Sequence, residues 1–443
     1  MTTADPAPEV RPAPALPRRV LAGYSLGSLV TGSFGTVPGL LLLPYLTDTL
    51  GVAAGVAGLL VLLPKAWDVL VNPVAGRISD RRGDRRPFLI VAGLALGVLF
   101  AALFAGPFRG GAPAGAYVAV AFLAAATAYA FFQVPYVAMP AELTDGYAER
   151  TRMMTWRVAV LALAILISGA VAPFVVDQTG GGITGHRWAG VFVGALIVAG
   201  TLGVYFGTRR AESRIAPEPE SDLRTQLRIA FANRPFRALL LCWIVQGVGV
   251  GTMLAGVQYF ADHVVGHASA ATFLFVAFVG PALLVMPLWS RVGRRIGKRR
   301  SLIAGSLLFG GFGVFMVAAP VLPEAAIYLI AALVGVGYAG QQVFAMAMLP
   351  DCIDLDTERT GSRQAGVFSG LWTAGETFGL ALGPGVYALI LQLFGYVSSS
   401  TGTAAVQDET AKLGVLLGFT LVPAVLVAAA VLLLNSRHDQ RAA

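Results

Sequence analysis

Apolar runs of about 20 residues recur along the whole 443-residue chain and alternate with short polar segments. A helix of about 20 apolar residues is long enough to cross the ~30 Å hydrocarbon core of a bilayer. The runs therefore predict an all-α membrane protein with twelve transmembrane helices. The predicted helices lie near residues 20–46, 54–76, 87–107, 115–140, 152–176, 188–208, 235–261, 269–290, 301–320, 324–349, 364–394 and 412–434.

The polar segments divide the predicted helices into two groups of six. The longest gap between apolar runs, 209–234, is expected to be a cytoplasmic linker between an N-terminal six-helix bundle, 20–208, and a C-terminal one, 235–434. Residues 1–19 are rich in Pro and Ala and contain no apolar run, so we expect a disordered cytoplasmic tail there and not a signal peptide. Residues 435–443 are expected to form a second cytoplasmic tail.

Composition agrees with a membrane protein, because 56% of the residues are hydrophobic and only 13% are charged. A soluble domain has about 25% charged residues. If the N-terminus is cytoplasmic, 28 of the 32 Lys and Arg residues fall in cytoplasmic segments. This positive-inside bias predicts a multi-pass protein of the cytoplasmic membrane with both termini inside. The net charge of +8 then reflects this topology, because the basic residues face the anionic headgroups of the cytoplasmic leaflet. No nucleic-acid partner is expected.

Two sequence stretches recur between the halves. DRRGDRRPFLI at 80–90 is similar to GRRIGKRRSLI at 293–303, and AMPAELTDGYAERT at 138–151 is similar to AMLPDCIDLDTERT at 347–360. Both pairs are separated by roughly 210 residues and follow equivalent apolar runs. The halves are therefore read as a duplicated six-helix unit. Two parallel six-helix repeats, with a site between them at mid-membrane, describe the major facilitator fold.

One acid, Asp68, lies about halfway along the second apolar run. A carboxylate is costly to bury at that depth and usually faces a cavity. Lys65 lies three residues earlier on the same helical face, and Asn72 continues that face by one turn. Asp68 is therefore expected to line a functional cavity. The alternative is a purely structural ion pair between Asp68 and Lys65.

Enzyme chemistry is not expected from this sequence. The four histidines, at 186, 263, 267 and 438, are predicted at helix ends or in a tail, and no glycine-rich phosphate loop with its lysine is present. Asp262, His263 and His267 have the spacing of metal ligands on a helix end, but no further ligand accompanies them, so no metal site is expected.

Four stretches, taken in order, resemble the glycoside–pentoside–hexuronide cation symporters, which include the melibiose permeases and have the sodium-dependent lysolipid symporters as cousins. They are WDVLVNP at 67–73, the cationic loop after it, VPYVAMPAELTDGYAERTR at 134–152, and MLPDCIDLDTERTGSRQAGVFSGLWTAGETFGLALGP at 348–384. The resemblance implies a cation-coupled symporter, which moves a glycoside or another small amphipathic solute by alternating access. The protein is expected to work as a monomer in the bilayer.

The resemblance also assigns roles to individual residues. Asp68 and Asn72 stand where the sugar carriers have two cation-binding acids, and Lys65 lies beside them. Because the second acid is an amide here, the coupling ion is expected to be a proton in preference to sodium, with no other cofactor. Arg157 matches an arginine of the fifth span, and Glu376 falls at or beside a lysine of the eleventh.

The expected substrate-binding residues are polar or aromatic side chains inside the apolar runs. Each has a plainer alternative: interhelical hydrogen bonding for the glutamines and the tyrosine, snorkelling for the arginine, lipid packing for the tryptophan, and a packing hydrogen bond for the glutamate. The residues are Gln133, Tyr136, Arg157, Gln342, Trp372 and Glu376.

The first and fourth spans carry no acid that could accept a sugar's paired hydroxyls. Glycosides with apolar aglycones are therefore expected to bind better than free sugars. The alternatives are a lysolipid-like or drug and natural-product transporter and, less favoured, an uncoupled channel or scramblase.

Charged loops at the cytoplasmic side are expected to close the inner mouth in one state of the transport cycle. Their alternative role is to set topology alone. The predicted gating residues are Arg81, Arg82, Arg85, Glu142, Asp145, Arg294, Arg295, Asp351 and Asp354.

Overall fold

The computed structural model describes residues 16–81, 86–108, 111–144, 147–211, 228, 231–360, 365–398 and 405–438. The N-terminal half comprises α1 (Arg18–Val37), which runs on through two π-helical turns to Thr49, and then α2 (Ala54–Arg81), α3 (Arg86–Leu103), α4 (Gly111–Leu143), α5 (Tyr147–Gln178) and α6 (Gly182–Thr208). The C-terminal half comprises α8 (Arg234–Phe260), which ends in a π-helical turn at Ala261–Val265, and then α9 (Ala270–Ile296), α10 (Lys298–Phe315), α11 (Glu324–Thr360), α12 (Ala365–Leu393), α13 (Glu409–Phe419) and α14 (Leu421–His438).

The helices follow the predicted apolar runs closely, and the all-α membrane fold is confirmed. Eleven helical segments in the described part of the chain are long and apolar enough to cross a membrane, with α13 and α14 counted as one, and α2 adds a shorter apolar segment, Ala54–Pro64. The last run differs from the prediction because it is split into α13 and α14 at Thr420. Long helices are the expected outcome, since a segment in lipid must satisfy its backbone hydrogen bonds internally.

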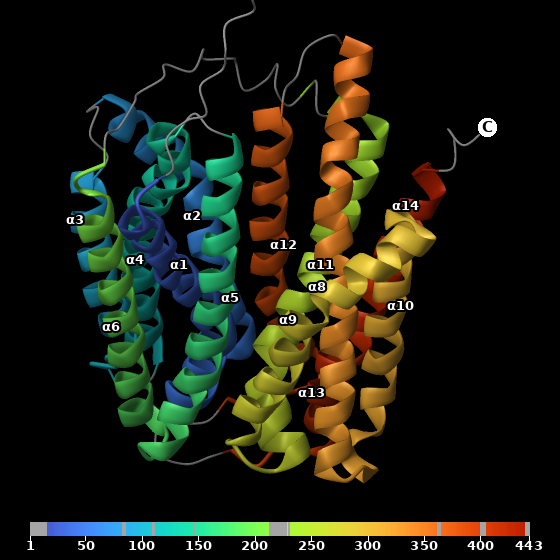
Figure 1. The fold of residues 1–443 in the computed structure, drawn as a ribbon. Coiled ribbons are helices and arrows are strands. Elements are labelled where there is room, and N and C mark those ends of the chain that lie inside the picture. Colours follow the sequence, from blue (N-terminus) through green and yellow to red (C-terminus); the bar gives the residue numbers. More distant parts are fainter. Residues whose placement is uncertain are drawn as a thin grey trace, which may run out of the picture.

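The two halves lie side by side, α1 to α6 in one group and α8 to α14 in the other (Figure 1). Helix pairing repeats between them: α1 packs on α5 and α6, as α8 packs on α12 and α14. In the same way, α3 packs on α4 as α10 packs on α11, and α2 packs on α4 as α9 packs on α11. The same set of contacts in each half is the structural counterpart of the repeated sequence stretches.

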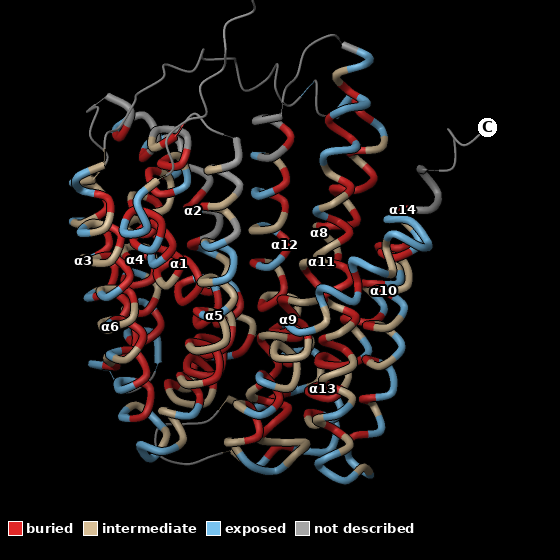
Figure 2. The backbone as a smooth tube through the Cα atoms, in the orientation of Figure 1, coloured by how far each residue is buried: buried red, intermediate tan, exposed pale blue. Residues whose placement is uncertain are grey.

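Small residues bring the helices into close contact. Gly23 of α1 faces Gly207 of α6, and a Cβ added to Gly23 would lie only 2.5 Å from the Gly207 Cα. Small residues at helix interfaces let backbones approach in a membrane, where apolar burial drives association weakly. Buried residues lie between the helices, and exposed ones cover the outside of each half (Figure 2).

The halves meet along a seam formed by α2 with α12 and by α5 with α9. A Cβ on Gly58 of α2 would lie 2.6 Å from the Ala388 Cβ of α12, and Gly169 of α5 lies against the ring of Phe275 of α9. These contacts belong to the end of the bundle at which α1 joins α2 and α5 joins α6. The arginine distribution predicts this to be the outer end, and we call it the predicted outer end.

Candidate functional site

One cluster of polar groups surrounds Arg157 of α5, in the N-terminal half. The guanidinium carbon lies 5.2 Å from the centre of the Tyr136 ring on α4, a distance at which a cation is attracted to an aromatic face. Tyr136 stacks on Tyr24 of α1 with ring centres 4.8 Å apart, and its hydroxyl donates to the Tyr24 carbonyl over 2.9 Å. Ser28 Oγ donates to the Arg157 carbonyl over 3.0 Å. Contacts from two other helices therefore hold Arg157 in place.

The predicted cavity residues of α4 differ in burial. Gln133 is half-buried, whereas the side chain of Tyr136 is completely buried. Because Tyr136 is enclosed between Tyr24 and Arg157, it supports the arginine and does not form an open wall. Arg157 itself is only half-buried, and within the described part of the chain its Nε has no hydrogen-bond partner. The arginine is thus held by its surroundings and retains hydrogen-bonding capacity.

The predicted coupling acid lies in the same region. Asp68 is buried on α2, and Tyr129 of α4 is within electrostatic reach of both Asp68 and Arg157. Asn72, one turn beyond Asp68, is exposed. The side chain of Lys65 lies outside the described residues, so the predicted pair with Asp68 stays a prediction.

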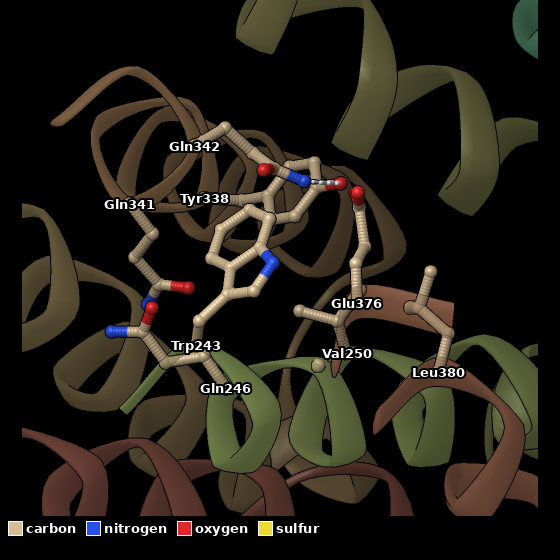
Figure 3. Close-up of a pocket in the computed structure, with 9 residues that line it drawn as sticks. Trp243, Gln246, Val250, Tyr338, Gln341, Gln342, Glu376 and Leu380 are labelled. Carbon is tan, nitrogen blue, oxygen red and sulfur yellow. Dashed lines mark hydrogen bonds between the residues drawn. The ribbon is translucent and has the colours of Figure 1, made fainter. Parts of the chain in front are cut away.

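A cavity lies in the C-terminal half, between α8, α11 and α12 (Figure 3). It holds about 280 Å³ of space, counting its open mouth. Its polar and aromatic lining is Trp243, Gln246, Tyr338, Gln341, Gln342 and Glu376, and Gly247, Val250 and Leu380 complete the wall. Two of the predicted substrate-binding residues, Gln342 and Glu376, are therefore brought together by the fold.

Several polar groups of this cavity have no hydrogen-bond partner among the described residues. They are Gln246 Oε1, Gln341 Nε2 and Trp243 Nε1, and all three atoms are buried. Gln342, in contrast, donates to the Tyr338 hydroxyl. Buried polar groups in proteins are almost always paired. Three unpaired groups around one cavity therefore indicate that a polar ligand can complete their hydrogen bonds.

Glu376 provides the acidic group of the cavity. Its side chain is half-buried, and no hydrogen bond or ion pair to it is found in the described part of the chain. It acts electrostatically on Tyr338, and Figure 3 shows the carboxylate turned toward that hydroxyl. An ionised carboxylate only accepts hydrogen bonds and can take two donors at once. Glu376 is therefore suited to hold paired hydroxyls or a single stronger donor.

Trp372 lies behind the cavity wall. It is 2% exposed and stacks on Trp243, and it is Trp243 that lines the cavity. The alternative that Trp372 packs against lipid is wrong, because the side chain is enclosed within the C-terminal half. Trp372 therefore supports the Trp243 indole from behind, and the aromatic face that lines the cavity is that of Trp243.

Sequence reasoning missed Trp243 and Tyr338. Trp243, Gln246 and Val250 are spaced so that they share one face of α8, and Tyr338, Gln341 and Gln342 share one face of α11. The signal was therefore present as helical spacing. It could not be recognised because nothing in the sequence shows that these two faces meet.

The predicted gating residues are described only in part. Arg82, Arg85 and Asp145 lie outside the described residues, as do the side chains of Arg81 and Glu142. Arg294, Arg295 and Asp354 are exposed at the predicted cytoplasmic end. Asp351 accepts from Lys298 Nζ over 2.6 and 2.7 Å, so this acid pairs within the C-terminal half.

A second polar cluster joins the two halves at the predicted outer end. Tyr396 donates to Asp48 Oδ1 over 2.9 Å, and His263 Nε2 lies 3.0 Å from the same tyrosine hydroxyl. Thr47 Oγ1 and the Tyr259 hydroxyl are 2.6 Å apart. Asp48 and Thr47 belong to the N-terminal half and the other three to the C-terminal half. We call these five residues the outer clamp.

Comparison with known proteins gives a consistent result. The family model described as MFS/sugar transport protein matches residues 23–436. A putative glycoside/cation symporter, YagG of Escherichia coli, is 26% identical over 93% of this chain and 90% of its own length. The isoprimeverose transporter of Lactiplantibacillus pentosus is 24% identical over 86% of this chain and 81% of its own length.

Among solved structures, a bacterial homologue of the human lysosomal transporter Spinster, in an inward-facing and unoccupied conformation, has a TM-score of 0.68 at 17% identity. The alignment covers 96% of both chains. At that identity the likeness shows the fold alone.

Proposed function

Because the chain belongs to the MFS/sugar transport protein family, it is a secondary transporter of the symporter kind and not an enzyme, and we propose that it moves a glycoside with an apolar aglycone together with a proton. The transport would take place across the cytoplasmic membrane by alternating access. The relatives named as glycoside and isoprimeverose carriers support a sugar-containing substrate.

The observation that carries the proposal is the set of unpaired groups around Trp243. A sugar ring presents hydroxyls that both donate and accept hydrogen bonds, together with an apolar face. Gln341 Nε2 and Trp243 Nε1 can donate to such hydroxyls, and Gln246 Oε1 and Glu376 can accept from them. The indole face of Trp243 offers the flat apolar surface. These groups suit one sugar unit.

The remaining lining favours an apolar aglycone. Val250, Leu380 and Gly247 supply the apolar part of the wall. A ligand with a polar head near Glu376 and an apolar body along the Val250 side would match the polar and apolar parts of the wall. A lysolipid-like molecule also has a polar head and an apolar body, and it is the second candidate.

Proton coupling is assigned to Asp68. It is a buried acid, and Asp68 and Arg157 both act electrostatically on Tyr129, so a change in the charge of Asp68 would be felt by the cluster around that arginine. Arg157 lies in the N-terminal half and the Trp243 cavity in the C-terminal half. A substrate that contacts both would respond to the proton on Asp68 and would draw the halves together. This arrangement supports coupling through movement at the seam between α2 and α12.

The test uses purified protein and a matched pair of ligands, an alkyl β-glucoside and free glucose. Quenching of tryptophan fluorescence and a thermal shift would both report occupancy of the cavity beside Trp243. We expect the alkyl glucoside to bind at least tenfold more tightly than glucose. Equal affinity for the two ligands would contradict the apolar-aglycone part and leave a conventional sugar symporter. Tighter binding of a lysolipid than of either sugar would favour the second candidate.

A further inference from the structure

The outer clamp contains one acid, Asp48, that belongs neither to the Arg157 cluster nor to the Trp243 cavity. Asp48 is partly buried, in the π-helical turn that follows α1. The hydroxyl of Tyr396 comes 348 positions later in the chain and donates to Asp48 Oδ1. The hydroxyl hydrogen of Tyr396 is used in the hydrogen bond to that carboxylate, so the Tyr396 oxygen can only accept from His263 Nε2. His263 Nε2 therefore carries a hydrogen. A chain of hydrogen bonds thus crosses from one half of the protein to the other.

The surroundings of Asp48 contain no compensating cation within the described residues. The charged group that acts on it is a second acid, Asp262, whose carboxylate accepts from Gln258 Nε2 over 3.1 and 3.2 Å. The neighbouring tyrosines 259 and 387 are neutral hydroxyls. The cations in the wider neighbourhood act on other groups, since Arg187 acts on Tyr45 and Lys412 acts on His263.

Other elements packed near the turn add few titratable groups. His186 of α6 packs its ring against Tyr45, with ring centres 4.8 Å apart, and the apolar segment of α2 at Ala54–Pro64 contains none. Asp177 and His267 act on Asp262 and not directly on Asp48. Asp48 is therefore an acid held against a neutral tyrosine, with another acid as its charged neighbour.

We propose that Asp48 is a proton-binding site in the outer gate, and that the gate takes up a proton from the external water when it closes and releases it when it opens. This inference rests on the alternating access put forward above. It assigns to Asp48 a role separate from that of Asp68, because Asp48 binds its proton at the seam between the halves and not beside the substrate.

The direction in which pH shifts the gate follows from the burial of Asp48. Removal from water raises the pKa of Asp48 to about 7 in the closed clamp, against an opposing contribution from the Tyr396 hydrogen bond. In an open gate the carboxylate would return to water, where an aspartate has a pKa of about 3.9. The closed state then binds the proton more tightly than the open one. Closing is favoured as pH falls through about 7, and the advantage saturates near the open-state pKa.

The hydrogen bond of the clamp survives this protonation. A protonated carboxyl still has a carbonyl oxygen that accepts from Tyr396, while the added proton occupies the other oxygen. Proton uptake therefore removes a buried charge without breaking the link between the halves. For one titrating group, the ratio of closed to open protein should rise by up to about tenfold for each unit of pH between roughly 7 and 5.

The experiment measures the outer opening directly by double electron–electron resonance. Spin labels at Thr179→Cys and Val406→Cys would report the distance between the halves at the outer end, since both positions are exposed there. The buried Cys242 and Cys352 are replaced by Ala. An Asp68→Asn background removes the coupling-site proton. We expect the short-distance population to grow as pH is lowered from 8 to 5.

Two variants at the clamp and one control decide the assignment. Asp48→Asn keeps a neutral acceptor for Tyr396, so it should hold the short distance at all pH values and lose the pH response. Tyr396→Phe removes a bond that lowers the pKa of Asp48, so it should keep the response but move its midpoint to higher pH. Glu409→Gln removes an exposed acid that pairs with Lys412 at the same end, and it should leave the response unchanged.

The outcomes separate this inference from the proposed function. If Asp48→Asn keeps the full pH response, Asp48 is not the proton site, although alternating access stands. A midpoint that does not move in Tyr396→Phe also overturns the assignment. If no sample at any pH shows a long-distance population, alternating access itself fails and the gate proposal fails with it.

Discussion

The indole of Trp243 lies parallel to that of Trp372, with ring centres 4.7 Å apart and planes inclined by 17°. Trp243 comes from α8 and Trp372 from α12, so the stack joins the first and fifth helices of the C-terminal half. Both indole Nε1 atoms are buried, and within the described part of the chain neither has a hydrogen-bond partner. Trp243 forms the aromatic wall of the candidate substrate cavity, and Trp372 supports it from behind.

Replacing Trp243 by Phe should weaken ligand binding and remove most of the fluorescence change on binding. Phe keeps an aromatic ring but lacks the indole N–H and leaves space beside Trp372. We expect a loss of about tenfold in affinity, because one neutral hydrogen bond contributes about 0.5–1.5 kcal/mol and stacking area is lost as well. Trp188→Phe, at an exposed position on α6, is the matched control and should bind normally.

Glu376→Gln should reduce substrate affinity more strongly. Hydrogen bonds to a charged group contribute about 1.5–3 kcal/mol, which corresponds to roughly 10- to 100-fold in Kd. Isothermal titration with the alkyl glycoside measures the change. Glu324→Gln, an exposed acid at the start of α11, is the control. Unchanged affinity in Glu376→Gln would exclude its carboxylate from the substrate site.

Asp68→Asn should abolish accumulation of substrate against a gradient, while exchange of labelled for unlabelled substrate continues in part. The amide cannot carry the coupling proton, but it keeps the size of the side chain, so the halves can still move with substrate bound. Uptake and counterflow into proteoliposomes measure the two activities. A variant that still accumulates substrate would show that coupling lies elsewhere. A strict sodium requirement of the native protein at constant pH would exclude the proton.

Tyr136→Phe should lower thermal stability and disturb Arg157. The substitution removes the hydroxyl that donates to the Tyr24 carbonyl, and an unsatisfied buried group costs about 1–3 kcal/mol. A differential scanning measurement should show a lower Tm. Tyr205→Phe, at a half-buried position on α6, is the control and should have little effect. Native Tm in Tyr136→Phe would show that the hydroxyl does not contribute to stability.

Reversing the charges of Asp351 and Asp354 to Lys should favour opening toward the cytoplasm. Asp351 pairs with Lys298 within the C-terminal half here. In the state with a closed inner mouth, both acids are expected to approach basic loops, so their reversal would weaken that closure. A reporter cysteine at Gly370, which has open space around it on α12, should then react faster with a cytoplasmic reagent in a protein lacking Cys242 and Cys352. Glu358→Lys, exposed on the same helix, is the control. Equal labelling rates would assign the acids to topology alone.

The helices could be predicted from the sequence because each apolar run carries its own signal. Asp68, Arg157 and Glu376 could be recognised in the same way, since a charge inside an apolar run is conspicuous. Burial could not be predicted, and Tyr136 is the example. It looks like a cavity residue because it is a polar group in an otherwise apolar fourth run, yet it is completely buried and packs against Tyr24 and Arg157.

The outer clamp was missed for a different reason. Asp48 and Tyr396 are unremarkable residues near the ends of apolar runs, and 348 positions separate them. Asp262 and His263 have the spacing of metal ligands along one helix, and this local spacing is the only pattern that the sequence shows for them. The contacts that they make depend on how the two halves pack against each other. A pattern within one short stretch of sequence does not indicate such contacts.

The missing side chain of Gly58 has a consequence for the energetics of the cell. Because Gly58 has no Cβ, α2 can lie directly against the Ala388 methyl group, where an added Cβ would come within 2.6 Å. Protons and small ions leak through a membrane protein along files of water molecules. A seam packed this tightly at one end of the carrier is expected to exclude such a file there. A cell could then hold many copies of the protein in its membrane without losing its ion gradient through them.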